Sequence, residues 1–221
     1  MSILREISSS VTQVAEAITI AIGVEVEIVH TDLTILGGTG IYASMIGQKE
    51  EGGHLDSNYL YARVLRSGVT ESIEDAKREA DYDEMGSGQT HFGELAEICT
   101  PIKNGDSIIG IIGLIAFTEK QKEILLDQKR SMVTFVEKMA DLLAAKAIQQ
   151  EILEDAEVSR DEMSTVLETT HEGIFALDRS GYIKHCNNMA ATLFKTTKAD
   201  IIGTHINEFM VGTPALEVIN T

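Results

Sequence analysis

The stretch from Glu119 to Thr170 contains neither proline nor glycine, and residues that favour helices dominate it. At ~1.5 Å per residue, an unbroken helix of ~50 residues would extend ~75 Å, which is much longer than a small domain. If the helix is unbroken, its middle must project from one domain to the next. The stretch therefore predicts two domains joined by a long helix.

Part of this stretch also has the spacing of a coiled-coil seam. Alternate steps of three and four residues connect Leu142, Ala145, Gln149, Ile152, Ala156, Ser159, Met163 and Val166. Met132, Phe135 and Met139 extend the series, with an irregular step at Leu142. We expect a parallel homodimer through residues 130–168, with a seam formed by Phe135, Met139, Leu142, Ile152, Met163 and Val166. The alternative is two separate helices that each pack on their own domain, because Gln149, Ala156 and Ser159 are weak seam residues.

Upstream of the long helix, the sequence predicts a mixture of helices and strands. Apolar residues recur at helical spacing before Gly23, at positions Leu4, Ile7, Val11, Val14, Ala15, Ile18 and Ala21. A hairpin is expected over residues 24–36, a short helix over residues 57–66 and a strand over residues 69–73. Residues 74–93 are polar, acidic and interrupted by glycines, which indicates a long surface loop.

The clearest local pattern is a second hairpin at residues 96–117. Residues 96–102 are typical of a strand, the KNGD sequence at residues 103–106 is typical of a turn, and residues 107–117 form the returning strand. These elements together predict an α+β fold, in which helices flank an antiparallel sheet.

Composition excludes several kinds of protein. A formal net charge of −17 argues against direct contact with nucleic acid, which requires clustered lysine and arginine. The most apolar run, Ile108–Phe117, has about ten residues, whereas a membrane-spanning helix needs ~20. The first residues lack the apolar segment of a secretory signal. Cys99 and Cys186 lie in different predicted domains without metal-ligand spacing, so we expect a reduced, cytoplasmic protein.

Two segments resemble known sensor domains. The order of elements over residues 1 to about 145 resembles a GAF domain, especially at EICTPIKNGDSIIGIIGLIAF (97–117). Residues 172–221 resemble the first half of a PAS domain, through Gly173, the DRSGYI turn (178–183), Asn187 or Asn188 before Ala190 and Ala191, and Gly203. The resemblance implies a GAF-like domain at residues 1–130, a long signalling helix at 131–168 and the N-terminal part of a PAS domain at 169–221.

The combination of DLTILGGTGIYASMIG (32–47), AEICTPI (96–102) and GIIGLIAF (110–117) resembles the N-terminal module of sigma-54-dependent transcriptional activators. In those proteins a GAF-like domain precedes a PAS domain, an AAA+ ATPase and a Fis-type helix-turn-helix. The resemblance implies a ligand-sensing regulatory region that relays binding of an unknown small molecule through a dimeric helix. The ATPase and the DNA-binding output, which would contact DNA and sigma-54 RNA polymerase, are expected outside these residues.

Other functions remain as alternatives. The chain can be the sensory region of a histidine kinase or of a cyclic-dinucleotide enzyme, or a purely structural dimerisation module. An enzyme whose acidic loop is catalytic is disfavoured, because no nucleophile, base and orienting residue can be assembled from the sequence. We therefore expect no catalytic residue, no metal and no cofactor.

The residues expected to line a ligand pocket in the GAF-like domain are Tyr42, Tyr59, Tyr61, His91, Phe92 and Cys99. Glycines around Tyr42 fit neither a phosphate-binding loop nor a dinucleotide fingerprint, so they indicate either a turn or a pocket rim. Cys99 lies in an apolar strand and is either a small core residue or a pocket thiol. His91 lies near acidic residues, but such a loop segment is usually a solvated face.

Overall fold

The computed structural model of the chain describes residues 3–76 and 93–209. It consists of two compact units, residues 1–153 and residues 154–221. Within the described ranges, no helix is both long enough and apolar enough to cross a membrane.

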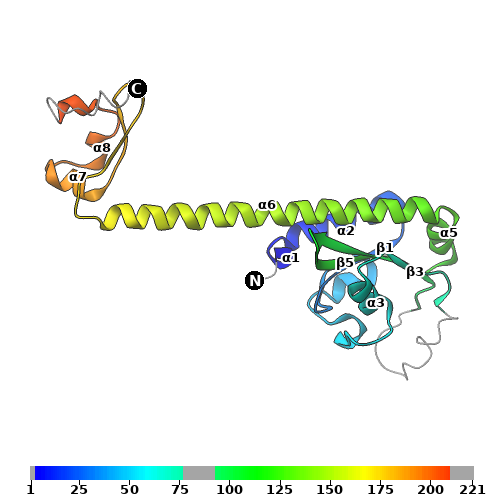
Figure 1. The fold of residues 1–221 in the computed structure, drawn as a ribbon. Helices are drawn as coiled ribbons and strands as arrows, with labels where there is room; N and C mark the ends of the chain where they lie inside the picture. The colour runs from blue at the N-terminus through cyan, green and yellow to red at the C-terminus, as the bar shows by residue number, and fades with distance from the viewer. Residues whose placement is uncertain (1–2, 77–92, 210–221) are drawn as a thin grey trace. The chain divides into compact units, whose positions relative to one another are not determined.

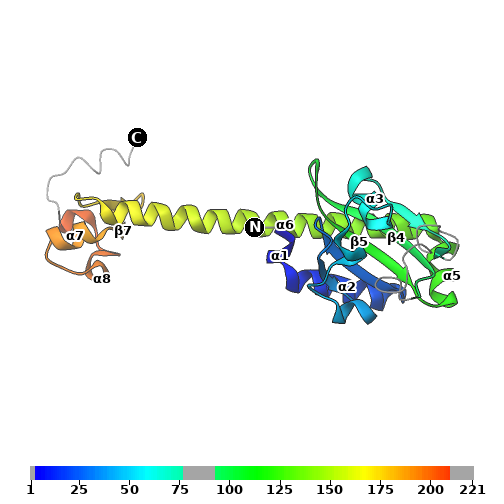
Figure 2. The same ribbon diagram turned by 90° about the horizontal axis from the view of Figure 1, so that it is seen from below.

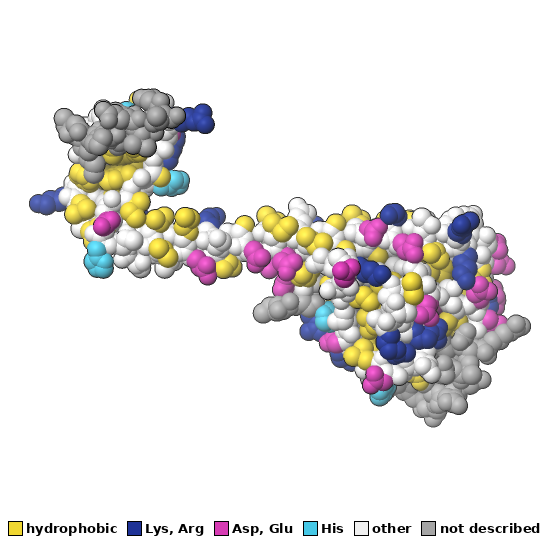
Figure 3. Space-filling view, in the orientation of Figure 1, with side chains coloured by type: hydrophobic (Ala, Val, Ile, Leu, Met, Phe, Trp, Pro, Cys, Tyr) yellow, Lys and Arg dark blue, Asp and Glu magenta, His cyan; other side chains and the backbone are white. Residues whose placement is uncertain are grey.

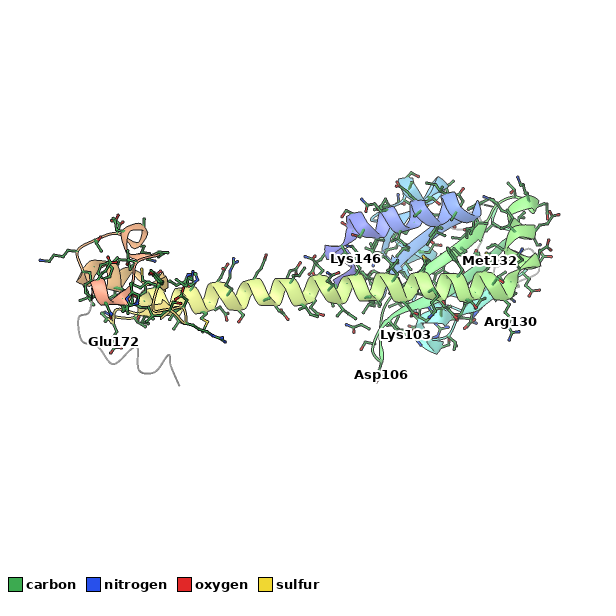
Figure 4. The ribbon with its side chains drawn as sticks, turned by 90° about the horizontal axis from the view of Figure 1, so that it is seen from above. Lys103, Asp106, Arg130, Met132, Lys146 and Glu172 are labelled. Carbon is green, nitrogen blue, oxygen red and sulfur yellow. The ribbon has the colours of Figure 1, made fainter. Side chains whose placement is uncertain are left out.

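The first unit is built on a five-stranded antiparallel sheet in the order β2-β1-β5-β4-β3. The strands are β1 (Glu25–His30), β2 (Ile35–Gly38), β3 (Glu71–Ile73), β4 (Ala96–Asn104) and β5 (Ser107–Ala116). Strands β4 and β5 form the predicted hairpin, whose loop begins with Gly105 at a φ of 58° that glycine adopts without steric cost. Figure 4 shows Lys103 and Asp106 near the end of this hairpin.

Helices cover both faces of this sheet. On one face lie α1 (Ile3–Glu6), α2 (Ser8–Ile22) and the first part of α6 (Lys129–Thr169), which share an apolar core with β1, β4 and β5. On the other face lies α3 (Leu60–Ser67), and Figures 1 and 2 show these helices around the sheet. The 3-10 helices η1 (Gly40–Ser44) and η2 (Glu50–Gly53) follow β2 along the chain. The expected α+β fold with an antiparallel sheet is confirmed.

The helices of the first unit end where glycines allow it. Gly23 closes α2 at a φ of 76°, and Gly68 closes α3 at a φ of 67°. Both angles lie in the left-handed region that glycine reaches at little cost. The predicted first helix has one interruption, at Ile7, which lies between α1 and α2.

The predicted helix from Glu119 to Thr170 is also interrupted once. Helix α5 (Glu119–Asp127) starts at a capping box formed by Thr118 and Gln121 and ends at Gln128, and α6 then begins at Lys129. Gln128 leaves the helical region with φ −121° and ψ 36°. The change of direction lets Leu125 of α5 and Val136 of α6 both join the apolar core. The long helix is therefore α6 alone.

Helix α6 has one buried apolar face and a set of exposed apolar residues. One face is buried in the first unit and consists of Val136, Ala140, Leu143, Ala144 and Ala147. Six further apolar residues of α6 are more than half exposed, namely Leu142, Ile152, Leu153, Val158, Met163 and Val166. Figure 3 shows hydrophobic side chains along the surface of this helix. Of the expected seam residues, Phe135 and Met139 are instead partly buried against the core of the first unit.

The second unit contains an antiparallel strand pair, β6 (Phe175–Leu177) and β7 (Ile183–Cys186). Helices α7 (Asn188–Leu193) and α8 (Lys198–Ile201) and the 3-10 helix η4 (Ile206–Glu208) follow. The expected turn forms at Asp178, whose carboxylate accepts hydrogen bonds from the backbone N–H groups of Ser180 and Tyr182. The expected asparagine cap of α7 is Asn187.

Candidate functional site

Three strands place Glu27, Gly113 and Cys99 in one row across the sheet of the first unit. Glu27 on β1 lies opposite Gly113 on β5, and Gly113 lies opposite Cys99 on β4. Residues opposite each other in an antiparallel sheet point to the same face, and so does Glu97, two positions before Cys99. Cys99 packs with residues of α3. The row therefore lies on the face covered by α3.

Gly113 leaves room for side chains to meet above the sheet. A Cβ atom at this position would collide with the hydroxyl of Tyr61 and would lie 3.3 Å from the Sγ atom of Cys99. The hydroxyl of Tyr61, which α3 supplies, therefore reaches down onto the backbone of β5. The φ of Gly113 is not in the left-handed region, so its backbone conformation does not require glycine. Glycine is required because a side chain here would collide with Tyr61.

Four glutamates are buried around this row, and we call them the carboxyl cluster: Glu27, Glu50, Glu94 and Glu97. Their exposed fractions are 0%, 5%, 7% and 3% respectively. Glutamate is almost never fully buried unless it is paired, so this concentration is unusual. The hydroxyl of Tyr42 donates a hydrogen bond to the Oε1 atom of Glu94. The cluster thus combines carboxyl groups with tyrosine hydroxyls inside the protein.

Burial controls the protonation of these groups. Loss of solvation raises the pKa of Glu27 well above its usual range, and repulsion from Glu50 adds to the shift. Burial raises the pKa of Glu97 in the same direction, with repulsion from Glu94 as the next cause. Burial also raises the pKa values of Tyr42 and Tyr61, so both hydroxyls keep their protons. The cluster therefore contains acids that hold protons at a pH where surface glutamates have lost theirs.

Glu27 is the most unusual member of the carboxyl cluster. Neither of its carboxyl oxygens has a hydrogen-bond partner of acceptable geometry in the described structure. The hydroxyl of Tyr61 lies close enough to favour the ionised form of Glu27 and so to lower its pKa, but that contact does not meet hydrogen-bond geometry. An unpaired buried carboxyl costs free energy unless something supplies a hydrogen-bond donor.

Three of the six expected pocket residues lie at this site. Tyr42 and Tyr61 are buried beside the carboxyl cluster, and Cys99 lies in the central row. Tyr59 is half-buried at the N-cap of α3. The expected residues His91 and Phe92, with most of the expected loop at 74–93, lie outside the described residues.

Sequence reasoning missed all four glutamates of the carboxyl cluster. Glu27 alternates with apolar residues in VEVEIVH, which is the pattern of a strand with one solvated face. Glu97, however, interrupts an otherwise apolar strand, AEICTPI, and such a strand is usually buried on both faces. That interruption is the signal that could have found the cluster. No set of three His, Cys, Asp or Glu side chains suited to a metal ion occurs among the residues that the structure describes.

In the second unit, one buried amide holds the end of α6. The Nδ2 atom of Asn187 lies 2.9 Å from the carbonyl oxygen of Leu167 and 2.8 Å from that of Glu172. Its Oδ1 atom accepts hydrogen bonds from the backbone N–H groups of Ile174 at 3.0 Å and Ala190 at 2.9 Å. The last carbonyl groups of a helix have no partner within the helix. Asn187 supplies a hydrogen-bond donor to one of these carbonyl groups, that of Leu167. It thereby ties the end of α6 to Ile174, just before β6, and to α7.

An ion pair supports the same connection. Lys198 at the start of α8 pairs with Glu168 on the last turn of α6, and the backbone N–H of Asn188 also donates to Glu168. A groove of 640 Å³ lies beside these residues, with Met163, Leu167 and Cys186 in its lining. Burial raises the pKa of Cys186, so its thiol is protonated and a weak nucleophile.

The raised pKa values predict an unusual dependence of stability on pH. Because folded Glu27 and Glu97 bind protons more tightly than the unfolded chain, their contribution to stability is fully present below the ordinary pKa of about 4.5. It is lost as the pH rises toward their raised folded pKa values, by at most about 1.4 kcal/mol per pH unit and group. Glu27→Gln removes one such group and should raise the melting temperature of the first unit at alkaline pH. Calorimetry from about pH 5 to pH 8.5 measures this slope.

The matched control is Glu25→Gln, on the same strand and half-buried, whose carboxylate already accepts a hydrogen bond of 2.6 Å from Thr39. It should keep the slope of the unmodified chain. Equal slopes for Glu27→Gln and the unmodified chain would show that Glu27 is not protonated in the folded protein.

Asn187→Ala is expected to destabilise the second unit by about 2–4 kcal/mol, because it removes a helix cap and leaves buried backbone groups without partners. Asn188→Ala is the control, since this neighbouring residue is exposed. Hydrogen exchange should show faster exchange at the end of α6 and in α7 for the first variant only. Similar exchange in both variants would contradict the role given to Asn187.

Comparison with known proteins agrees with these two units. The family model described as PAS fold matches residues 161–218. The putative uric acid sigma-54-dependent transcriptional regulator UacR of Escherichia coli K12 is 24% identical over 205 residues, which is 91% of this chain and 33% of UacR. The chain thus spans about a third of the length of this relative.

Solved structures show the same fold. A chain of the E. coli DhaR(N)–DhaL complex matches 92% of this chain and 69% of its own length, with a TM-score of 0.58 and 14% identity. The GAF domain region of a putative membrane protein from Geobacter sulfurreducens matches 65% of this chain and 93% of its own length, with a TM-score of 0.50 and 14% identity. The chain is therefore similar over most of its length to the GAF-like and PAS sensory region of a sigma-54-dependent transcriptional regulator.

Proposed function

We propose that this chain is the signal-receiving region of a sigma-54-dependent transcriptional activator, and that a small molecule binds it at the carboxyl cluster. The observation that carries the proposal is the buried carboxyl of Glu27, which lacks a hydrogen-bond partner in the described structure. A group that is costly in the free protein and satisfied by a ligand gives that ligand binding energy. Tyr42, Tyr61 and Cys99 lie beside the cluster and would contact the same ligand.

The relative UacR is named for uric acid, and this name suggests a first ligand to test. In its neutral form, uric acid presents N–H donors and carbonyl acceptors around a flat ring, whereas its anion would add negative charge to the cluster. Carboxyl groups accept hydrogen bonds from such N–H groups, while tyrosine hydroxyls donate to carbonyl oxygens. The carboxyl cluster offers acceptors and the hydroxyl of Tyr61 a donor, while the hydroxyl of Tyr42 donates to Glu94.

The relay runs through α6. Its buried face belongs to the core of the first unit, and its last turn is held by Asn187 and Lys198 in the second. A ligand that changes the packing of the first unit therefore acts on a helix that also anchors the second. The ligand must bind one arrangement of the helix better than another, because equal affinity for both would shift nothing.

Dimerisation completes the proposed relay. Leu142, Ile152, Met163 and Val166 lie on the expected seam and are more than half exposed in the single chain. Pairing of two α6 helices in a parallel homodimer would cover them. In this scheme residues 1–130 are the GAF-like sensor, residues 131–168 the signalling helix and residues 169–221 part of the PAS domain. The cytoplasmic full-length protein would add the ATPase and the contacts with DNA and sigma-54 RNA polymerase.

The seam has a direct test. Ile152→Glu should convert a dimer to a monomer in light scattering, because the charge would be buried against the partner helix. Val158→Glu is the matched control, since Val158 is equally apolar and 58% exposed on the same helix but lies off the seam. If both variants remain dimers, or if the unmodified chain is a monomer, the proposed seam is wrong.

Ligand binding is tested by titrating uric acid into the purified chain and measuring its thermal stability. A true ligand at a hundredfold excess over its Kd stabilises the folded state by about 2.7 kcal/mol. We expect stabilisation of the first unit and loss of this effect in Tyr42→Phe, which lacks the hydroxyl that faces Glu94. If uric acid and a wider panel of metabolites of either charge all fail to stabilise the chain, the first unit is a structural dimerisation module instead.

A further inference from the structure

We infer that the ligand of the first unit is a nitrogen compound rich in N–H donors, which binds the carboxyl cluster and releases protons from it. This inference rests on the proposed function, because it specifies the chemistry of the same site. It goes further by excluding ligands that bind as anions and by coupling binding to protonation.

The groups around Glu27 determine this chemistry. Its strongest electrostatic neighbours are Glu50 from η2 and Glu94 ahead of β4, and the Tyr61 hydroxyl from α3 acts in the opposite direction. Glu97 on β4 and Tyr42 on η1 belong to the same network, and Cys99 lies beside Tyr61. None of the described groups that shift the pKa of Glu27 or Glu97 is a lysine or an arginine. The cluster is thus rich in acceptors.

The buried carboxyl of Glu27 also points to a ligand by its lack of a hydrogen-bond partner among the described residues. Its carboxyl is 0% exposed, and in the described part of the chain neither oxygen has a hydrogen-bond partner. A carboxylate is satisfied only by donors, and N–H donors that carry positive charge form the strongest hydrogen bonds with it. A carboxylate or phosphate ligand would instead add negative charge to a buried acidic site, which is strongly unfavourable.

Proton release follows from the same contacts. In the free protein, burial and mutual repulsion keep protons on the cluster. Hydrogen bonds from a ligand to a carboxyl group favour its ionised form, so the displaced proton passes to solvent as the ligand binds. Affinity should then rise with pH, by as much as tenfold per pH unit for each proton released. An acidic ligand would show the opposite trend, because the cluster would take up protons to receive it.

The test is calorimetric titration of the 221-residue chain with three probes of different chemistry. Agmatine represents an organic cation, hypoxanthine a neutral N–H heterocycle and malonate an acid. Titrations in two buffers of different ionisation enthalpy, between about pH 6 and pH 8.5, count the protons exchanged. We expect agmatine or hypoxanthine to bind with proton release, and malonate not to bind.

Variants separate this inference from the proposed function. Glu27→Gln should weaken binding of the donor probe at least tenfold and reduce proton release, whereas Glu25→Gln should match the unmodified chain. Retained melting of the first unit checks that both variants fold. Preferential binding of malonate, proton uptake, or an unchanged affinity in Glu27→Gln overturns the inference but leaves a ligand-sensing function standing. Failure of both donor probes at millimolar concentration overturns the inference, and failure of every small molecule overturns the proposed function as well.

Discussion

Burial of four carboxyl groups on one face of the sheet is the constraint on which the first unit depends. Ionised and unpaired, these groups would be too costly to bury, so the fold must either keep protons on them or supply donors. Tyr42 supplies one donor, to Glu94. Gly113 lets Tyr61 reach the same region by leaving out a side chain on β5. The opposite face of the sheet carries an ordinary apolar core, so it stabilises the unit independently of the cluster.

Helix α6 runs from the first unit into the second, and its sides differ in burial. Leu143 is buried in the first unit, while the adjacent Leu142, about 100° away around the helix, is 53% exposed. Of the proposed seam positions, Phe135 and Met139 before Leu142 are partly buried, whereas Leu142, Ile152, Met163 and Val166 are exposed. At its other end, the helix is held by the buried amide of Asn187 and by the ion pair between Glu168 and Lys198.

The sequence predicted the parts of this protein that local chemistry specifies. Gly23, the KNGD turn and the asparagine before α7 each have a direct conformational reason, and each lies where the pattern placed it. The break at Gln128 was missed, because it depends on where Leu125 and Val136 pack rather than on a helix-breaking residue. The carboxyl cluster was missed for a related reason. Its members come from separate elements, and alternation in VEVEIVH normally indicates a solvated face.

We propose that Glu27 is held protonated in the free protein and ionises when a donor ligand binds. Nuclear magnetic resonance of the side-chain carboxyl carbons, in a chain labelled at glutamate and assigned with Glu27→Gln, measures this directly. We expect Glu27 to titrate well above the range of the surface glutamates and to shift toward the ionised form with a bound N–H donor. Titration of Glu27 together with the surface glutamates, unchanged by any ligand, would contradict it.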